Sequence, residues 1–459
     1  MPERRLEVHM DGDHAGTLTM SSSGALTFGY DDDYRFAPGA TPLSLSMPKS
    51  TGRHRQRAVL PFVQGLLPDN PQALGSLASS YQVSARSPFA LLEHVGHDVA
   101  GALQFVVPGE TSEDAAADRS AVDTISDDEV AAALAEVIEV YRTGRPLRGG
   151  ERLRISLAGA QPKIALVLTP DGWARPRRGA PTTHILKPEY RTPRSLTDER
   201  FPNLVTVEMF SLAVARHAGL RVPNAFHWQA PDGDLRALVL ERYDRFVGED
   251  GLVHRAHQED LCQAMSVPPE KKYQHHDGGP GVGSVAELLR SRLTARDRVR
   301  VARDFLSLLT LNIAMVNTDA HAKNYSLLLR GDGVELAPAY DVLSIAPYET
   351  QETAQHPLDF PMRVGDTYRI SAILPGVIAA EGVRLGLGAD ESRAVVDRVL
   401  AAVPGALEAA REEVAGVPGG MQVADSTIRN LRAISPLHAP APSAVDLAAR
   451  GRARDVTPP

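Results

Sequence analysis

Alternating hydrophobic and polar positions at the start of the chain predict short strands. "RLEVHMDG" and "GALTFGY" place apolar side chains at every second position, and "MDGDHAGTL" turns on Asp11-Gly12, which predicts a hairpin. "SPFALLEHVG" instead predicts a helix that is capped by Ser87 and begins at Pro88, and "GALQFVV" predicts a returning strand. Residues 1–107 are therefore expected to form a β-rich N-terminal subdomain.

The pattern then changes to a linker and one long helix. Residues 108–125 are acidic and poor in large apolar side chains, which is typical of a linker. Ser126 and Glu129 form an S-x-x-E capping signature before "VAAALAEVIEVYRTG", so a helix is expected that ends at Gly144. We assign residues 108–150 to this linker and helix.

A second β-containing unit is predicted for residues 151–245. "RISLAGAQPKIALVL" predicts a strand, a glycine-containing turn and another strand, and "THILKP" predicts a further short strand. Residues 204–219 show helical spacing of apolar side chains. "LRALVLERYDR" predicts a strand that leads into a charged connector.

Helical patterns dominate the remaining chain. They include "SVAELLRSRL", residues 301–316 and "GADESRAVVDRVLAAV". Residues 246–434 are therefore expected to form a mostly helical lobe, whereas residues 435–459, rich in Pro and Ala without periodicity, are expected to be disordered. The expected fold class is α+β, with two lobes.

Composition narrows the function classes. The 459 residues are too many for one hydrophobic core, so two or three domains are expected. A net charge of -8 argues against binding nucleic acid through a broadly basic surface. The single cysteine, Cys262, excludes an intramolecular disulfide and fits a reducing compartment. Because the chain also lacks a long apolar run and an apolar signal region, we expect a cytoplasmic protein without membrane contact.

Candidate chemistry begins with "NTDAHAKNYSLLL", which places polar residues between two apolar runs. Asp319 and Asn324 have the D-x-x-x-x-N spacing with which protein kinases supply a catalytic base and a metal-binding amide. Such an aspartate orients the acceptor hydroxyl, and the asparagine oxygen helps to hold Mg²⁺. The alternative is that Asp319 caps an element and Asn324 satisfies a turn.

Other residues fit the same chemistry. Asp341 in "LAPAYDVLS" is a candidate chelator of the metal that bridges the β- and γ-phosphates. Lys187, in the predicted strand "THILKP", is a candidate ligand of the α- and β-phosphates, and Glu208 on the following helix could pair with it. Glu208 could equally be a solvated carboxylate on a helix face.

Two further segments, a turn between strands and a connector, give the chain all the parts of a two-lobed phosphotransferase in their usual sequence order. The turn "LAGAQPK" contains Gly159, whose backbone could approach phosphates closely, and Lys163 adds charge there. "ERYDR", residues 241–245, follows a strand at the place where a kinase connector holds adenine through its main chain.

With these motifs in order, the chain resembles the HipA family of toxin serine/threonine kinases through nearly its full length. The resemblance rests on the following stretches: "RISLAGAQPK", "THILKP", "VLERYDR", "HQEDLCQA", "KYQHHDGGPG", "NTDAHAKNYS" and "PAYDVLS", with "TPLSLSMP" and "LPFVQGLLPDN" in the N-terminal subdomain. It implies a kinase that uses ATP and Mg²⁺, with Asp319 as the catalytic residue and Asn324 and Asp341 as metal ligands. The residues implied for nucleotide binding are Ala158, Gly159, Ala160, Gln161, Pro162, Lys163, Lys187, Glu241, Arg242, Tyr243, His321, Ala322, Lys323, Asn324, Tyr340 and Asp341.

The resemblance also implies regulation and partners. Ser156 falls where family members phosphorylate themselves, which would switch the kinase off. A helix-turn-helix antitoxin of the HipB type is the implied partner, and operator DNA would be contacted only through that complex. Family members are associated with aminoacyl-tRNA synthetases as protein substrates. Two alternatives stay open, a small-molecule phosphotransferase and a catalytically silent kinase fold that acts as a co-repressor.

Overall fold

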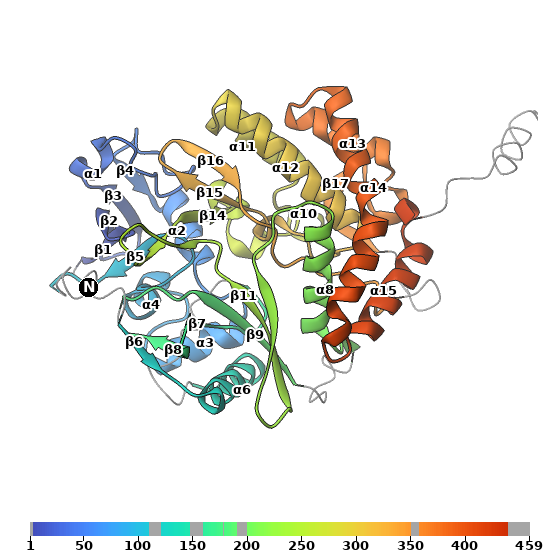
Figure 1. Ribbon diagram of the computed structural model, residues 1–459. Coiled ribbons are helices and arrows are strands. Elements are labelled where there is room, and N and C mark those ends of the chain that lie inside the picture. Colours follow the sequence, from blue (N-terminus) through green and yellow to red (C-terminus); the bar gives the residue numbers. More distant parts are fainter. Residues whose placement is uncertain are drawn as a thin grey trace, which may run out of the picture.

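An antiparallel sheet opens the computed structural model, which describes residues 3–109, 121–146, 159–177, 179–190, 200–349 and 358–438 (Figure 1). Its strand order is β4-β3-β2-β1-β5. The strands are β1 Arg4–Met10, β2 Asp13–Met20, β3 Leu26–Tyr30, β4 Arg53–Arg55 and β5 Leu103–Val106. The predicted hairpin is confirmed, because Met10 pairs with Asp13 across Asp11 and Gly12, whose φ angles of 50° and 100° suit a tight turn.

Short helices accompany this sheet. They are α1 Asp32–Phe36, α2 Gln56–Gly65, α3 Pro71–Ser80 and α4 Pro88–Val95. The predicted cap of α4 is confirmed: the Ser87 hydroxyl accepts the backbone N–H of Ala90 at 3.3 Å, and Pro88 is the first helical residue.

The long helix α6, Asp127–Thr143, follows the linker as predicted. Ser126 and Glu129 form the capping box at its start, and Gly144 ends it with φ 70°. The linker itself contains the short strand β6, Val122–Thr124, which pairs with a later strand.

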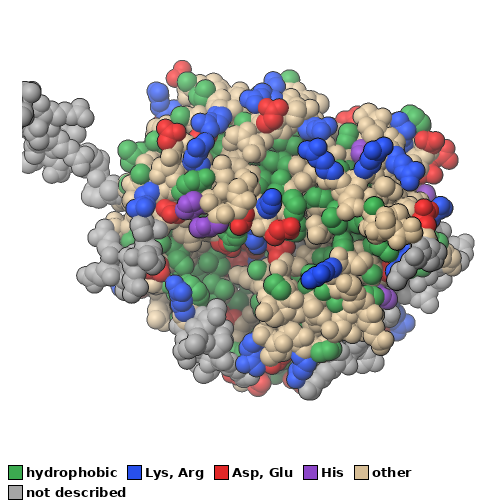
Figure 2. All heavy atoms as spheres, turned by 180° about the vertical axis from the view of Figure 1, so that it is seen from behind, with side chains coloured by type: hydrophobic (Ala, Val, Ile, Leu, Met, Phe, Trp, Pro, Cys, Tyr) green, Lys and Arg blue, Asp and Glu red, His purple; other side chains and the backbone are tan. Residues whose placement is uncertain are grey.

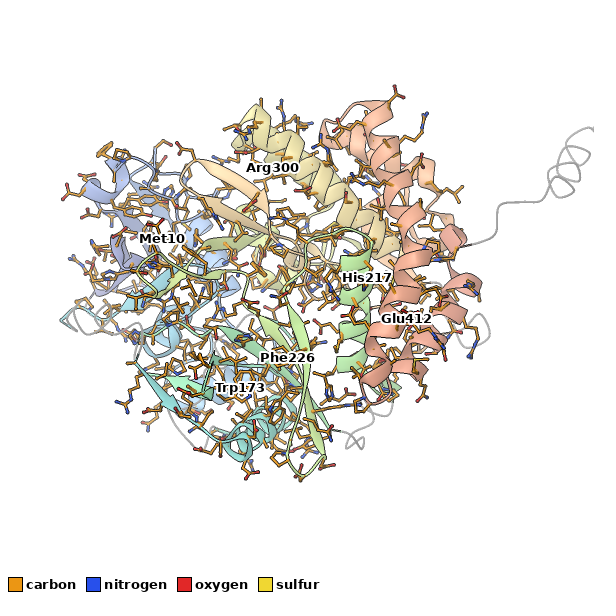
Figure 3. All side chains as sticks on the ribbon, in the orientation of Figure 1. Met10, Trp173, His217, Phe226, Arg300 and Glu412 are labelled. Carbon is orange, nitrogen blue, oxygen red and sulfur yellow. The ribbon has the colours of Figure 1, made fainter. Side chains whose placement is uncertain are left out.

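A second antiparallel sheet forms the lower part of Figure 1. Its order is β10-β11-β9-β7-β8-β6, and its other strands are β7 Ile164–Thr169, β8 Gly172–Pro176, β9 His184–Tyr190, β10 Ala225–Gln229 and β11 Leu235–Glu241. Trp173 and Phe226, labelled in Figure 3, lie in this sheet, and the ring of each is in edge contact with the His184 ring. Helix α8, Leu204–His217, connects β9 to β10.

The rest of the chain is mostly helical, as predicted, but it also contains strands. The helices are α9 Leu261–Ala264, α10 Gln274–Asp277, α11 Val282–Arg292, α12 Ala295–Ala314, α13 Pro375–Leu385, α14 Ala389–Glu413 and α15 Gly420–Ile434. The strands are β12 Arg245–Val247, β13 Val253–Arg255, β14 His257–Asp260, β15 Ser326–Arg330, β16 Gly333–Leu336, β17 Asp359–Val364 and β18 Thr367–Arg369. Single 3₁₀ turns are Pro269–Lys271, Ala322–Asn324, Ile370–Ala372, Val414–Gly416 and Pro436–His438.

Helix α8 lies against α14 and α15 (Figure 1). The His217 ring contacts the Glu413 carboxylate at 3.0 Å (Nε2–Oε2), and Figure 3 shows His217 on α8 beside Glu412, the residue before Glu413 on α14. Helix packing therefore places α8 with the helical lobe, although its sequence position lies between strands of the second sheet.

Strand β11 separates two hydrophobic cores. Its Ala237 and Val239 pack with the N-terminal sheet, α6 and the second sheet, whereas Leu238 and Leu240 pack with the helical lobe around α12. This division follows from the alternation of side chains along a strand. Nearly the whole of β11 is buried, so the boundary between the lobes runs along this strand.

Part of the predicted C-terminal tail is ordered. Pro436–His438 forms a 3₁₀ turn, and the His438 ring contacts the carbonyl oxygen of Ala314 at 2.8 Å. The tail beyond residue 438 lies outside the described residues, as do Ser156 and Ala158.

The molecular surface mixes charges. The face in Figure 2 carries basic and acidic side chains interspersed, without a broad basic patch. Among the described residues, none of the helices is long and apolar enough to cross a membrane.

Candidate active site

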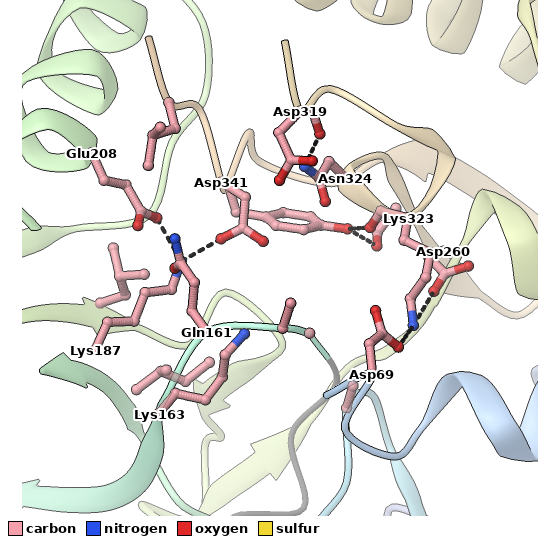
Figure 4. A pocket seen from close by; sticks show the side chains of 18 of the residues that line it. Asp69, Gln161, Lys163, Lys187, Glu208, Asp260, Asp319, Lys323, Asn324 and Asp341 are labelled. Atoms are coloured by element: carbon pink, nitrogen blue, oxygen red, sulfur yellow. Dashed lines mark hydrogen bonds and ion pairs between the residues drawn. The ribbon is translucent and has the colours of Figure 1, made fainter. Parts of the chain in front are cut away.

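A cavity of about 430 Å³ lies at the boundary between the lobes. Most of the predicted site residues line it: Gly159, Ala160, Gln161, Lys163, Lys187, Glu208, Glu241, Arg242, Tyr243, Asp319, His321, Lys323, Asn324, Tyr340 and Asp341. Figure 4 shows Lys187 pointing toward the carboxylates of Glu208 and Asp341. Pro162 and Ala322 belong to the same segments but do not line the cavity.

Backbone strain and one asparagine shape the loop of residues 317–324, which follows α12. Val316 has φ 53°, a conformation that a β-branched residue rarely adopts. The Asn317 side chain donates to the Asn312 amide oxygen at 2.9 Å and to the Asp341 carbonyl at 3.3 Å, and it accepts the N–H of Asp319 at 3.1 Å. Asn317 therefore joins the loop both to α12 and to the segment of Asp341.

The predicted pair Asp319 and Asn324 is held by direct contacts. The Asn324 amide nitrogen donates to the Asp319 carbonyl at 2.7 Å, which leaves the Asn324 amide oxygen available at the cavity. The Asp319 carboxylate reaches solvent at the cavity mouth and accepts a hydrogen bond from the Tyr273 hydroxyl. The packing of protein around Asp319 raises the pKa of its carboxyl above the ordinary value.

His321 is neutral at physiological pH. Burial lowers the pKa of its ring to about 3, and the ammonium group of Lys272 adds to this effect. Its Nδ1 atom is buried and has no hydrogen-bond partner among the described residues. A bound ligand could supply that partner, because His321 lines the cavity.

Lys187 is paired with Glu208, so of the two roles left open for Glu208 the structure shows the ion pair and not the solvated carboxylate. Strand β9 and helix α8 bring their charged groups to 2.6 Å (Nζ–Oε1), and both side chains are buried. The Lys187 ammonium also contacts Asp341, whose φ of 51° places it in the left-handed region. Burial alone would lower the pKa of Lys187, but the carboxylates of Asp341 and Glu208 outweigh burial and hold the pKa above the ordinary value.

The residue 159–163 turn depends on its glycine. Gly159 has φ 117°, and a Cβ atom there would lie 2.5 Å from the ammonium nitrogen of Lys163. Lys163 is buried beneath the turn, and burial lowers the pKa of its amine. The left-handed φ therefore favours glycine at position 159, whereas the Cβ contact alone could be relieved by a shift of the flexible end of Lys163.

The connector after β11 presents main chain and one aromatic ring to the cavity. The Arg242 side chain turns away into a buried ion cluster, 2.8 Å from Asp244 (Nη2–Oδ2) and 3.5 Å from Asp98 (Nη1–Oδ2). The ring of Tyr243 stacks on that of Tyr340 at a centroid distance of 5.9 Å. Arg242 can therefore contribute to a nucleotide site through its backbone rather than its charge.

The residues at or beside the cavity that the sequence-based prediction missed include Asp69, Lys272, Tyr273 and Asn317. Asp69 and Lys272 line the cavity. Tyr273 and Asn317 hold Asp319 through its side chain and its backbone, respectively. Each lies in a stretch that carries the family resemblance, "LPFVQGLLPDN", "KYQHHDGGPG" or "NTDAHAKNYS", which is the signal that could have indicated them.

Comparison with known proteins identifies relatives over most of the chain. A sequence model of the HipA-like C-terminal domain matches residues 155–407, and one of the HipA N-terminal domain matches residues 6–106. Y4mE of Sinorhizobium fredii, described as a candidate kinase, is 39% identical over 348 residues, which covers 76% of this chain and 79% of Y4mE.

Two further comparisons point to one relative from Shewanella oneidensis. Its serine/threonine-protein kinase toxin HipA is 29% identical over 418 residues, covering 88% of each chain. The solved structure of the Shewanella oneidensis complex of HipA, HipB and operator DNA contains a chain with a TM-score of 0.72 and 26% identity, covering 93% of this chain and 95% of that one. The two-lobed α+β kinase-like fold is therefore confirmed, and the chain belongs to the HipA family of toxins and is a serine/threonine-protein kinase.

Proposed function

We propose that the protein is an ATP- and Mg²⁺-dependent kinase that acts as a toxin by phosphorylating a protein of its host cell. One observation carries the proposal: a single cavity brings together Asp319, Asn324, Asp341 and the Lys187–Glu208 pair from four separate segments. These are the groups that phosphoryl transfer requires for positioning and for charge stabilisation.

Asp319 would act on the acceptor. Its carboxylate stands at the cavity mouth, where it would accept the hydrogen bond of a serine or threonine hydroxyl and then its proton. Lys187 would bind the α- and β-phosphates, because Glu208 already holds its ammonium group at the cavity. The contact between Lys187 and Asp341 would open when these groups take up the nucleotide and its metal ion.

The donor set fits Mg²⁺. Asn324 and Asp341 offer hard oxygen ligands at one side of the cavity, and the amide of Asn324 is oriented by its contact with Asp319. A metal there would neutralise charge on the transferred phosphate, and phosphate oxygens and water would complete its coordination. ATP would lie between the residue 159–163 turn and the connector of Glu241 and Tyr243.

Replacing Asp319 by asparagine tests the proposal. Asp319→Asn should retain ATP binding but lose transfer of labelled phosphate from ATP to proteins of a host-cell lysate, by about 10² or more, because a positioned base is removed. Transfer at the parental rate would contradict the assignment of Asp319. If the parental protein itself transferred no phosphate while binding ATP, the alternative of a silent kinase fold would be favoured.

We also propose an antitoxin partner and a class of substrate. The similarity to the chain in the HipA, HipB and operator DNA complex supports a helix-turn-helix antitoxin of the HipB type, through which operator DNA would be contacted. Aminoacyl-tRNA synthetases in the cytoplasm are the proposed substrates, a proposal that rests on the family resemblance. Identification of the labelled lysate proteins by mass spectrometry would test it, and labelling confined to unrelated proteins would refute it.

Ser156 is the proposed site of inhibitory autophosphorylation. It precedes the turn of Gly159, and a phosphate there would bring about -1.5 to -2 charges beside the site of the nucleotide phosphates. After incubation with ATP and Mg²⁺, mass spectrometry should find the phosphate on Ser156, and calorimetry should find weaker ATP binding. Unchanged ATP affinity of the phosphorylated protein would count against this regulation.

A further inference from the structure

Asp69 belongs to the N-terminal subdomain but reaches the kinase cavity. It lies between α2 and α3, directly before Asn70, whose side chain caps α3 by accepting the N–H of Ala73 at 2.9 Å. The Asp69 side chain is 10% exposed and lines the cavity. In Figure 4 it points at Lys323 from the side opposite the 317–324 loop.

Three separate parts of the site contact this one residue. The Asp69 carboxylate lies 2.6 Å from the ammonium group of Lys323 and 3.3 Å from that of Lys272. Its backbone N–H donates to the carbonyl oxygen of Gly159 at 3.2 Å. Asp69 therefore joins the 317–324 loop, the segment before Tyr273 and the turn proposed to hold phosphates.

The Lys323 ammonium group has two buried counter-ions, and Asp69 is the nearer of them. The Lys323 side chain is 4% exposed, and the carboxylate of Asp260 is farther away, at 4.0 Å. Asp260 also caps α9, where its other oxygen accepts the N–H of Gln263 at 2.9 Å. Without the Asp69 charge, the buried ammonium would keep only the more distant Asp260 as a counter-ion. Lys323 would then shift toward Asp260 and take with it the loop that carries it.

Lys272 links Asp69 to Asp319 through an ion pair and through the neighbouring residue Tyr273. The carbonyl oxygen of Lys272 accepts the N–H of Ala322 at 3.2 Å, so this segment lies directly on the 317–324 loop. The next residue, Tyr273, donates its hydroxyl hydrogen to the Asp319 carboxylate. The ion pair of Asp69 with Lys272 thus anchors the segment that holds the proposed catalytic aspartate.

We infer that Asp69 is a positioning residue for phosphoryl transfer and that the N-terminal subdomain is thereby an integral part of the kinase centre. This inference rests on the proposed function of the cavity. Asp69 takes no part in bond making or proton transfer. It fixes Lys323 and the Lys272–Tyr273 segment so that Asp319 is oriented toward the acceptor.

The test replaces Asp69 by asparagine in the full chain. Asn keeps the size of the side chain and the backbone N–H to Gly159, but it removes the charge that pairs with Lys323. We expect kcat for transfer of labelled phosphate to lysate proteins to fall about tenfold or more, by a larger factor than any rise in KM for ATP. A kcat within about twofold of the parent, or a loss seen only as a raised KM for ATP, would overturn the inference.

Asp11→Asn is the matched control. The Asp11 carboxylate also ties the N-terminal subdomain to the rest of the chain, through the N–H of Arg255 at 3.0 Å and the His254 ring at 2.8 Å, but Asp11 does not line the cavity. It should lower thermal stability and leave kcat at the parental value. If both variants lost the same fraction of kcat, Asp69 would have only a structural role.

Lys272→Met supplies a second variant in case Asp69→Asn does not fold, because the Lys272 side chain is less buried than that of Lys323. It should also lower kcat, and the double variant should be no more than about twofold slower than Asp69→Asn, because both changes break the same ion pair. Parental kcat in Lys272→Met, or losses that multiply in the double variant, would overturn the inference.

Asp319→Asn is measured in parallel to separate the two proposals. If it transfers phosphate at the parental rate, the proposed function fails. If it is inactive while Asp69→Asn and Lys272→Met are fully active, only the role of Asp69 fails.

Discussion

At the scale of single residues, the sequence predicted the groups that carry charge and missed those that hold them. Asp319 and Asn324 have a short, characteristic spacing, so both could be predicted locally. Asp69 and Tyr273 could not, because each contacts the 317–324 loop from a distant part of the chain. Spacing along a sequence indicates neighbours within a loop, but it does not indicate which remote side chains fold against that loop.

The pairing of Glu208 with Lys187 leads to a prediction about ATP affinity. Glu208→Gln keeps the shape of the side chain but replaces an ion pair by a hydrogen bond from the Lys187 ammonium to a neutral amide oxygen, a difference of about 1 kcal/mol. We therefore expect the Kd for ATP to rise about fivefold in calorimetric titrations. Glu287→Gln, which changes an exposed carboxylate on α11, should bind ATP as the parent does. If the parent and both variants bound ATP with the same Kd, Glu208 would have no role in ATP binding.

Asp341 is expected to link nucleotide affinity to the metal. Asp341→Ala removes a carboxylate from the cavity, so Mg²⁺ should no longer strengthen ATP binding in that variant. Titrations of ATP with and without Mg²⁺ measure the difference. Asp332→Ala, in the exposed turn between β15 and β16, is the control and should keep the full metal effect. If Mg²⁺ still strengthened ATP binding in Asp341→Ala, Asp341 would not be a metal ligand and would serve only as an ion-pair partner of Lys187.

At the scale of elements, the helix boundaries that could be predicted from the sequence are those marked by capping residues. Ser126 and Glu129 begin α6 as expected, and Gly144 ends it. The helix expected at residues 301–316 begins earlier, at Ala295, because the Thr294 hydroxyl caps it by accepting the N–H of Asp297 at 3.2 Å. Apolar spacing alone did not reveal this start, since the first turns of α12 are rich in charged residues.

The cap of α6 can be tested by its effect on stability. Ser126→Ala removes the acceptor for the N–H of Glu129, and such a loss typically costs about 1 kcal/mol. Denaturant unfolding should show a decrease of that size in the free energy of unfolding. Ser22→Ala, in the exposed turn after β2, should leave it unchanged. A loss common to both variants would mean that the cap contributes no measurable stability.

At the scale of the whole molecule, the strand order could not be read from the sequence. The order β10-β11-β9-β7-β8-β6 joins the linker strand Val122–Thr124 to strands more than a helix away in the chain. Nor did any pattern assign α8 to the helical lobe. The strand order and the position of α8 depend on which apolar faces of strands and helices pack against each other. The alternation of apolar and polar residues shows that an element has an apolar face, but it does not show which other element covers that face.

The contact between the N-terminal subdomain and β14 predicts a pH dependence of stability. The buried Glu259 carboxyl accepts the N–H of Leu45 at 2.8 Å and contacts the Ser44 hydroxyl at 2.5 Å, and burial raises its pKa to about 8. Between the ordinary pKa near 4.5 and this value the folded state holds a proton that the unfolded state releases. Stability should therefore fall as the pH rises from 5 to 8, by at most about 1.4 kcal/mol per pH unit from this group.

Glu259→Gln isolates that contribution. Glutamine cannot ionise, so the variant should lose less free energy of unfolding between pH 5 and pH 8 than the parent does. Chemical denaturation at both pH values gives the comparison. An identical decrease in both proteins would show that Glu259 does not release its proton on unfolding in this range.

Because the two faces of β11 pack into different hydrophobic cores, this strand affects how the protein unfolds. A residue such as Val239 belongs to one core and its neighbour Leu240 to the other, so neither core can lose this strand alone. The described residues are therefore expected to unfold in one cooperative transition, with a single peak in scanning calorimetry. This is expected although two separate family models match the N-terminal and C-terminal parts of the sequence. A protease that cuts between residues 107 and 121 should yield fragments that stay associated and melt together.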